Sequence, residues 1–191
     1  MLTGGRPGLT SPETNPYRPA IPVAWQRRLA AVLLDCGTSA AVVVPDSRLE
    51  GILQCLAEGG LTVRRLTREE ECVAFAAGHR VTGRRPVLFM QSSGLGNAAN
   101  ALGSLAIPYG LAVPLVISMR GTCGERNPAQ VAMGQSTVPL LTALGVQAFS
   151  IRSEKQVEPV TRGALTLCFE GGCPAAILLE PELGGGRDER S

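Results

Sequence analysis

The sequence predicts an α/β fold: a doubly wound, mainly parallel six-stranded sheet with helices on both faces. Hydrophobic residues make up 45% of the 191 residues and aromatic residues only 4%. A core built from Val, Leu, Ile and Ala is typical of a parallel sheet covered by helices. Strand-like and helix-like patterns also alternate along the chain, which favours parallel strands joined by right-handed crossovers.

The chain is expected to begin with an arm, a helix and a strand. Residues 1–22 are rich in proline and glycine, so we expect a flexible arm there. The apolar positions of residues 25–36 recur with helical spacing, and Gly37 can end this helix. A buried strand is expected over residues 40–44, and it stops at Pro45.

Two helices and a short strand come next. Ser47 can cap a short helix that ends before two glycines. Residues 63–66 have the composition of a short strand. Thr67 and Glu70 have the spacing of a capping box, which predicts a helix over residues 68–81.

The middle of the chain places a glycine-rich loop between a strand and a helix. Residues 86–91 form an apolar, strand-like run, and the loop Ser-Gly-Leu-Gly-Asn follows it. A helix is expected over residues 97–107. A strand over residues 113–119 then leads into an irregular segment, residues 120–134.

The last third of the chain supplies two more helices and two more strands, expected at residues 137–144, 148–151, 154–170 and 174–180. Because the alternation of elements ends there, we expect one domain over residues 23–183. Residues 184–191 should form a tail.

Composition argues against nucleic-acid, membrane and zinc-binding functions. The net charge is +2, and the basic residues, all Arg except Lys155, form no stripe interleaved with aromatic residues. No apolar run reaches the roughly 20 residues that a membrane span requires, and no signal peptide is visible. The six cysteines form no CxxC pair and only one His is present. We therefore expect free thiols in the cytoplasm and no metal site on this chain.

The segment from Thr67 to Asn100 is the most informative for function. An acidic cluster, Glu69 to Glu71, begins a helix of small residues, and a buried strand then leads into the glycine-rich loop. A carboxylate at a helix N-terminus beside an apolar crevice can bind and polarise a cofactor ring. Gly94 and Gly96 would let a ligand or a second backbone approach closely. Both segments follow strands, so they should lie at the carboxyl edge of the sheet.

Each of these features also has a purely structural explanation. A carboxylate such as Glu69 in the first turn can simply complement the helix dipole. The loop can be a strand-to-helix turn in which the glycines take positive φ and Asn97 caps the helix. His79 is expected to be structural. Cys123 is not expected to be a nucleophile, because the sequence pairs no base with it.

Three motifs together resemble a known family. They are REEECVAFAAG at residues 68–78, MQSSGLGN at residues 90–97, and a strand that ends in Arg120-Gly121 with Gly-Glu shortly after. This pattern resembles the α subunits of sulfopyruvate decarboxylase and the matching half of phosphonopyruvate decarboxylase, which are thiamine-diphosphate enzymes. The resemblance covers roughly residues 25–180 and corresponds to the pyrimidine-binding (PYR) domain, which has a flavodoxin-like fold.

The resemblance implies a catalytic glutamate. In this family one Glu of the PYR domain hydrogen-bonds N1′ of the cofactor's pyrimidine ring and promotes the imino tautomer that activates the thiazolium ring. That Glu lies nine residues before the glycine of the small-residue helix, and this glycine is Gly78 here. Glu69 therefore takes the catalytic role. Its expected apolar setting would raise its affinity for a proton.

The resemblance also implies the residues around the ligands. The glycine-rich loop is expected to bind the cofactor through Gly94, Leu95, Gly96 and Asn97. The expected substrate contacts are Ser92, Ser93 and Arg120. Ser92 stands where relatives often have Asn. A guanidinium suits a sulfonate or phosphonate group, because it can donate to two oxygens at once.

A partner subunit is implied as well. The diphosphate-binding (PP) domain of these enzymes carries a GDG motif that holds Mg2+ and diphosphate, and this chain has no GDG. We expect a separate β subunit to supply that domain in a hetero-oligomer of two α and two β subunits or more. The small-molecule substrate would be a 2-oxo acid with a second anionic group, such as 3-sulfopyruvate or 3-phosphonopyruvate.

Two other functions fit the same residues. A thiamine-diphosphate enzyme can pass the activated group to an aldehyde or acyl acceptor, which makes the enzyme a carboligase. The chain can also be a non-catalytic α/β module that binds a small ligand or regulates a partner. The sequence alone does not separate these alternatives.

Overall fold

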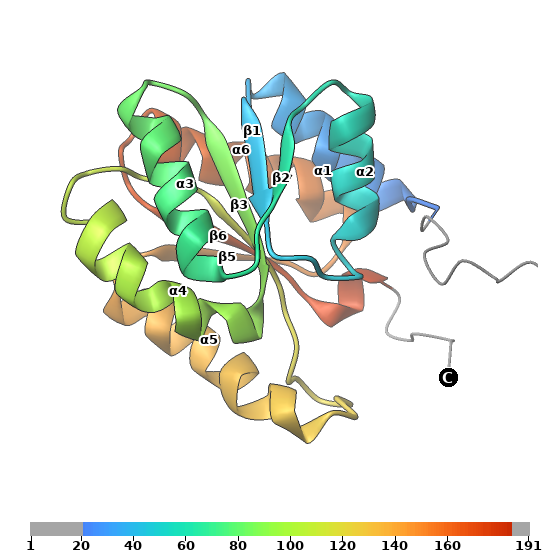
Figure 1. Cartoon of the computed structure of the whole chain (residues 1–191). Helices are drawn as coiled ribbons and strands as arrows, with labels where there is room; N and C mark the ends of the chain where they lie inside the picture. The colour runs from blue at the N-terminus through green and yellow to red at the C-terminus, as the bar shows by residue number, and fades with distance from the viewer. Residues whose placement is uncertain (1–20, 185–191) are drawn as a thin grey trace, which may run out of the picture.

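Six parallel strands form a single sheet in the order β2-β1-β3-β4-β6-β5 (Figure 1). In the computed structural model, which describes residues 21–184, β1, β4 and β6 are buried along their whole length. Such strands are continuous apolar runs because helices cover both faces of the sheet. The strands are β1 (Ala40–Val43), β2 (Val63–Arg65), β3 (Pro86–Gln91), β4 (Leu115–Ser118), β5 (Gln147–Ile151) and β6 (Ala175–Leu179).

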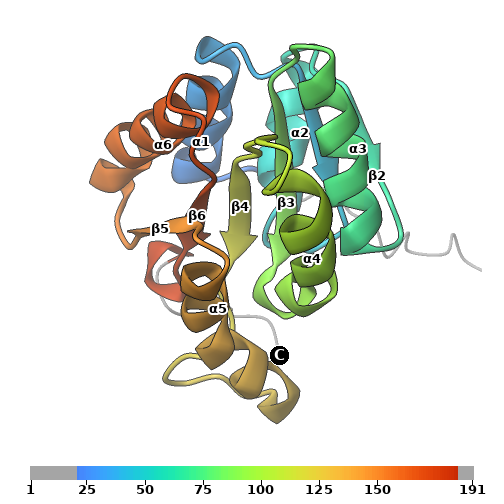
Figure 2. The ribbon, with the colours of Figure 1, turned by 90° about the vertical axis from the view of Figure 1, so that its left-hand side faces the viewer.

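Helices cover both faces of the sheet (Figures 1 and 2). One face carries α1 (Ala24–Asp35), α2 (Glu50–Glu58) and α6 (Glu154–Phe169). The other carries α3 (Glu69–Val81), α4 (Leu95–Ala101) and α5 (Val131–Ala143), and a π-helical stretch, Leu102–Ala106, continues α4. Successive strand residues point to opposite faces. Phe89 therefore belongs to the first layer of the core and Leu88 to the second.

The predicted fold class is confirmed, and the largest difference is the start of α5. This helix begins at Val131 rather than at residue 137. A 3-10 turn, Pro128–Gln130, leads into it, and the side chain of Asn127 accepts the N–H of Ala129 at 3.1 Å. A proline in the first turn and an Asn cap together start a helix that the sequence pattern placed later.

Two predicted helix caps are wrong. Ser47 does not cap α2. The preceding Asp46 instead accepts the backbone N–H two residues on at 2.8 Å. Thr67 and Glu70 form no capping box, because α3 begins at Glu69 and its cap makes no side-chain hydrogen bond. Thr67 donates its hydroxyl to Glu71 at 2.9 Å and its N–H to the same oxygen at 3.3 Å.

The predicted arm at residues 1–22 and tail at residues 184–191 lie outside the described residues, except for Ile21, Pro22 and Gly184. Within residues 21–184, no helix combines the length and the apolar character needed to cross a membrane.

Candidate active site

The carboxyl ends of β1 and β3 form the topological switch point of the sheet. The chain leaves β1 toward β2 and leaves β3 toward β4, in opposite directions. Ligands of doubly wound folds bind in the crevice at this point. Here Gln91, at the end of β3, donates its amide to Asp46, after β1, at 2.7 Å. Ser93 donates its hydroxyl to the side-chain oxygen of Gln91, also at 2.7 Å.

Glu69 is the buried member of the acidic cluster. It is the first residue of α3, and its exposed fraction is only 9%. Glu70 is half-buried and Glu71 is exposed. Cys72 and Val73, three and four residues further on, are fully buried. Residues with this spacing share one helix face, so the phase of α3 turns Glu69 toward the core and the carboxyl edge of the sheet.

The glycine-rich segment lies directly against this carboxylate. Asn97 donates its side-chain amide to Glu69 Oε2 at 3.0 Å. A Cβ atom at Gly94 would lie 2.4 Å from Glu69 Oε1 and 2.6 Å from its Cδ. Real Cβ atoms do not approach other atoms so closely, so only glycine leaves room for the carboxylate in this position.

The segment is helical rather than a loop. Ser92–Gly94 forms a 3-10 turn, and α4 begins at Leu95. Gly94 has φ −70°, Gly96 has no positive φ, and Asn97 does not cap α4. The expectation of positive φ and an Asn cap is therefore wrong. The glycines serve close packing instead, since a Cβ at Gly96 would lie 3.0 Å from Met133 Cε in α5.

Leu95 and Ser92 are both fully buried, and neither presents its side chain to solvent. Leu95 belongs to the core layer under α4. The Ser92 hydroxyl accepts the backbone N–H of Arg120 at 3.2 Å. The two side chains thus hold the edge of the sheet in place from inside.

The Arg120 side chain forms a bidentate ion pair with Glu125. Its Nε and Nη2 atoms donate to the two carboxylate oxygens at 2.8 and 3.0 Å. Glu125 also accepts the backbone N–H groups of Gly121 at 3.2 Å and Asn127 at 3.0 Å. These donors, led by the Arg120 side chain, lower the pKa of Glu125 to about 2. The ion pair gives the loop after β4 a fixed shape.

This loop packs backbone to backbone on the start of α5. Gly121 has φ 75°, and a Cβ there would lie 2.3 Å from the carbonyl oxygen of Gln130. A Cβ at Gly134 would lie 2.0 Å from the carbonyl oxygen of Arg120. The two glycines therefore set the distance between the Arg120 loop and α5.

The sequence analysis assigned no role to Asp46 or Gln91. It missed Arg48, which donates to the carbonyl oxygens of Met119 at 2.9 Å and Glu180 at 3.1 Å. These carbonyls follow the ends of β4 and β6. A polar residue just after a strand at the switch point is the signal that could have pointed to the Asp46–Gln91 pair.

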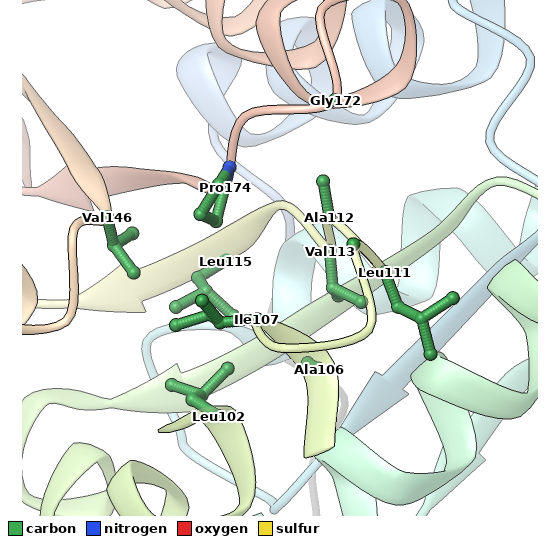
Figure 3. Close-up of a pocket in the computed structure, with 11 residues that line it drawn as sticks. Leu102, Ala106, Ile107, Leu111, Ala112, Val113, Leu115, Val146, Gly172 and Pro174 are labelled. Carbon is green, nitrogen blue, oxygen red and sulfur yellow. The ribbon is translucent and has the colours of Figure 1, made fainter. Parts of the chain in front are cut away.

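A small apolar cavity lies at the opposite edge of the sheet (Figure 3). Its volume is about 20 Å³, and apolar side chains such as Leu102, Ile107 and Val146 line it. Val146 and Pro174 immediately precede β5 and β6, which places the cavity at the amino ends of the strands. A void of this size holds about one water molecule. It is therefore not a site for a cofactor, and its lining does not include Glu69.

Cys72 is a buried apolar neighbour of Glu69 and does not act as a nucleophile. Burial, with the charge of Glu69 adding to it, raises the pKa of its thiol to about 12. The thiol therefore stays protonated near neutral pH. Within the part of the chain that the structure describes, no group of three His, Cys, Asp or Glu side chains could hold a metal ion.

Fold and edge together define a class: a doubly wound α/β domain with one buried carboxylate at the carboxyl edge of its parallel sheet. The chain belongs to the thiamine pyrophosphate enzyme family, since residues 25–148 match its N-terminal TPP-binding domain. It is 35% identical over 149 residues to the sulfopyruvate decarboxylase subunit alpha of Methanococcus maripaludis, a match that covers 78% of this chain and 89% of that one. The predicted resemblance to this decarboxylase family is confirmed.

Two further similarities agree with this assignment. The phosphonopyruvate decarboxylase of Streptomyces viridochromogenes is 32% identical over 115 residues, which cover 59% of this chain and 29% of that protein. The fold also resembles a solved 2-oxoglutarate:ferredoxin oxidoreductase from Magnetococcus marinus, with a TM-score of 0.65 and 14% identity. This match covers 84% of the present chain and 29% of the oxidoreductase chain. At this identity it supports the fold alone.

Proposed function

We propose that this chain is the PYR-domain α subunit of a thiamine-diphosphate-dependent decarboxylase. Its substrate would be a 2-oxo acid with a second anionic group, such as 3-sulfopyruvate or 3-phosphonopyruvate. The observation that carries the proposal is the buried Glu69 carboxylate, which lies over Gly94 and is held by Asn97 at the carboxyl edge of the sheet. The names of the relatives agree with the reaction and with both substrates.

The residues at this edge fit the pyrimidine ring of the cofactor. Glu69 offers a carboxylate oxygen to a ring nitrogen, and Gly94 has no side chain that would obstruct a flat ring. When bound, thiamine diphosphate supplies the electron sink for loss of carbon dioxide from a 2-oxo acid. Glu69 would hold and share a proton with the ring nitrogen. Cys72 and Val73, both fully buried, exclude water from the inner side of that contact.

We propose that the substrate binds at the carboxyl edge of the sheet, beside the loop that carries Arg120. Ser93 is half-buried and Arg120 is partly exposed, so both can face a ligand. Ser92 would act indirectly, because its buried hydroxyl fixes the Arg120 backbone. A guanidinium already oriented by Glu125 would bind a sulfonate or phosphonate with little loss of side-chain entropy.

A β subunit with the PP domain would complete the site and hold Mg2+ and the diphosphate, in a hetero-oligomer of two α and two β subunits or more. The partner would cover the surface formed by helices α4 and α5, which lie beside each other (Figure 2). No charged residue occurs in residues 86–119 or 127–151, and Val138 in α5 is 45% exposed. Charged residues are depleted in the cores of protein interfaces. We also place the enzyme in the cytoplasm, because all six cysteines are free thiols.

The test is to purify the chain with its partner subunit and assay carbon dioxide release from both substrates with thiamine diphosphate and Mg2+. We expect Glu69→Gln to abolish turnover and the neighbouring variant Glu70→Gln to keep it. Full activity of Glu69→Gln would contradict the mechanism. Condensation products with an added aldehyde, in place of a simple aldehyde product, would instead identify a carboligase.

A further inference from the structure

Asn97 lies on α4 but directs its side-chain amide to a residue of another helix. The neighbouring Leu95 and Ala98 are buried in the core, whereas Asn97 is on the exposed side of α4. Its one side-chain hydrogen bond among the described residues is the 3.0 Å contact with Glu69 Oε2. The amide does not cap its own helix. The only side-chain group it bonds is therefore the proposed catalytic carboxylate.

The two oxygens of Glu69 are in different environments. Oε2 accepts the amide of Asn97. Oε1 lies over Gly94 and, within residues 21–184, accepts no hydrogen bond. Oε1 is not fully buried, although it has no hydrogen-bond partner, so it retains some access to solvent. A half-turn of the carboxylate would exchange the two oxygens without changing these contacts, whereas a displacement away from Asn97 would break the hydrogen bond.

We propose that Asn97 is a positioning residue, which holds Glu69 so that one carboxylate oxygen is presented to the pyrimidine ring. This inference rests on the proposed function, and it differs from a direct contact between Asn97 and the cofactor. Asn97 supplies the donor on one side of the carboxylate and Gly94 supplies the space beneath it. The remaining oxygen keeps its lone pairs for the ring nitrogen.

The physical reason is orientation. A free Glu side chain has three rotatable torsions, and a catalytic group displaced by about 1 Å can lose on the order of 100-fold in rate. A hydrogen bond to a charged group is strong enough to favour one orientation over the others by about 10-fold or more. The amide of Asn97 therefore has the strength that this role requires.

The experiment compares Asn97→Asp and Asn97→Ala with Asn100→Asp and Asn100→Ala in the complex with the partner subunit. Asn100 is exposed on the same helix, and its side chain makes no hydrogen bond within residues 21–184. We expect about a 10-fold loss of kcat for Asn97→Ala. The loss should be about 100-fold for Asn97→Asp, because two carboxylates would then face each other at hydrogen-bond distance. The Asn100 variants should stay within about twofold of wild type.

Two further measurements separate positioning from a general structural role. A crystal structure of Asn97→Ala should show Glu69 in a changed or mixed rotamer, with the fold intact. In a Glu69→Gln background, Asn97→Ala should not weaken thiamine diphosphate binding, measured by calorimetry, any further. The inference fails if Asn97→Asp matches Asn100→Asp in activity or if Glu69 stays in place without Asn97. The proposed function would survive that result provided that Glu69→Gln is inactive.

Discussion

The substitution Gly94→Ala should displace the Glu69 carboxylate while it leaves the fold largely intact, so it tests the effect of the carboxylate position on activity. The added Cβ would lie 2.4 Å from Glu69 Oε1, where ordinary contacts begin at 3.4 Å, so the carboxylate must move by about 1 Å. The backbone does not oppose the change, because Gly94 has φ −70°. The clashing atoms are the end of a flexible side chain, so the fold should lose no more than about 1–3 kcal/mol. The rate should fall by about 100-fold.

The assay is decarboxylation by the complex, with thermal unfolding followed by circular dichroism on the same samples. Gly78→Ala is the matched control, since Gly78 is a helical residue of α3 and a Cβ added there would meet no atom within 4 Å. It should keep full activity and gain about 1 kcal/mol of stability. Equal activity of the two variants would show that the carboxylate position does not matter, and the reasoning about Glu69 would be refuted.

The other predictions concern the loop after β4. Because the pKa of Glu125 is lowered to about 2 from its usual 4.5, its ion pair should stabilise the fold above pH 4.5 and lose this effect as the pH falls toward 2. Urea unfolding of wild type and Glu125→Gln should show a stability difference that shrinks over that range, and a constant difference would contradict the assignment. Gly134→Ala, whose Cβ would lie 2.0 Å from the Arg120 carbonyl oxygen, should lower the free energy of unfolding by about 1–3 kcal/mol. Gly163→Ala on α6, which meets nothing within 4 Å, should not lower it, and equal unfolding midpoints for the two variants would rule out the backbone contact.

The fold could be predicted because its signal is local. Strands such as β3 and β6 are continuous apolar runs, and the helices between them have apolar positions at helical spacing. The burial of Glu69, rather than of the other two acids in the cluster, depends on helix phase. That phase is also present in the sequence, where Cys72 and Val73 lie three and four residues further on.

The rest of the site depends on contacts between distant segments. Two glycines within Ser-Gly-Leu-Gly-Asn suggested a loop, because glycine usually marks a turn. Here both glycines lie in helical backbone. Glycine is needed because side chains from α3 and α5 occupy the space that a Cβ atom at Gly94 or Gly96 would fill. The pairing of Arg120 with Glu125 and the amide bond from Asn97 to Glu69 are likewise tertiary contacts, and no local pattern encodes them.

Arg48 has a consequence for how the chain is made. Its guanidinium joins carbonyls after β4 and β6, and its own carbonyl accepts the side-chain amide of Gln26 in α1. An arginine near the beginning of the domain thus forms a hydrogen bond with a peptide group at residue 180, near the end of the domain. On the ribosome this junction cannot form until almost the entire domain has emerged from the exit tunnel. Early strands can collapse together during synthesis, but the edge that carries the proposed site is completed last.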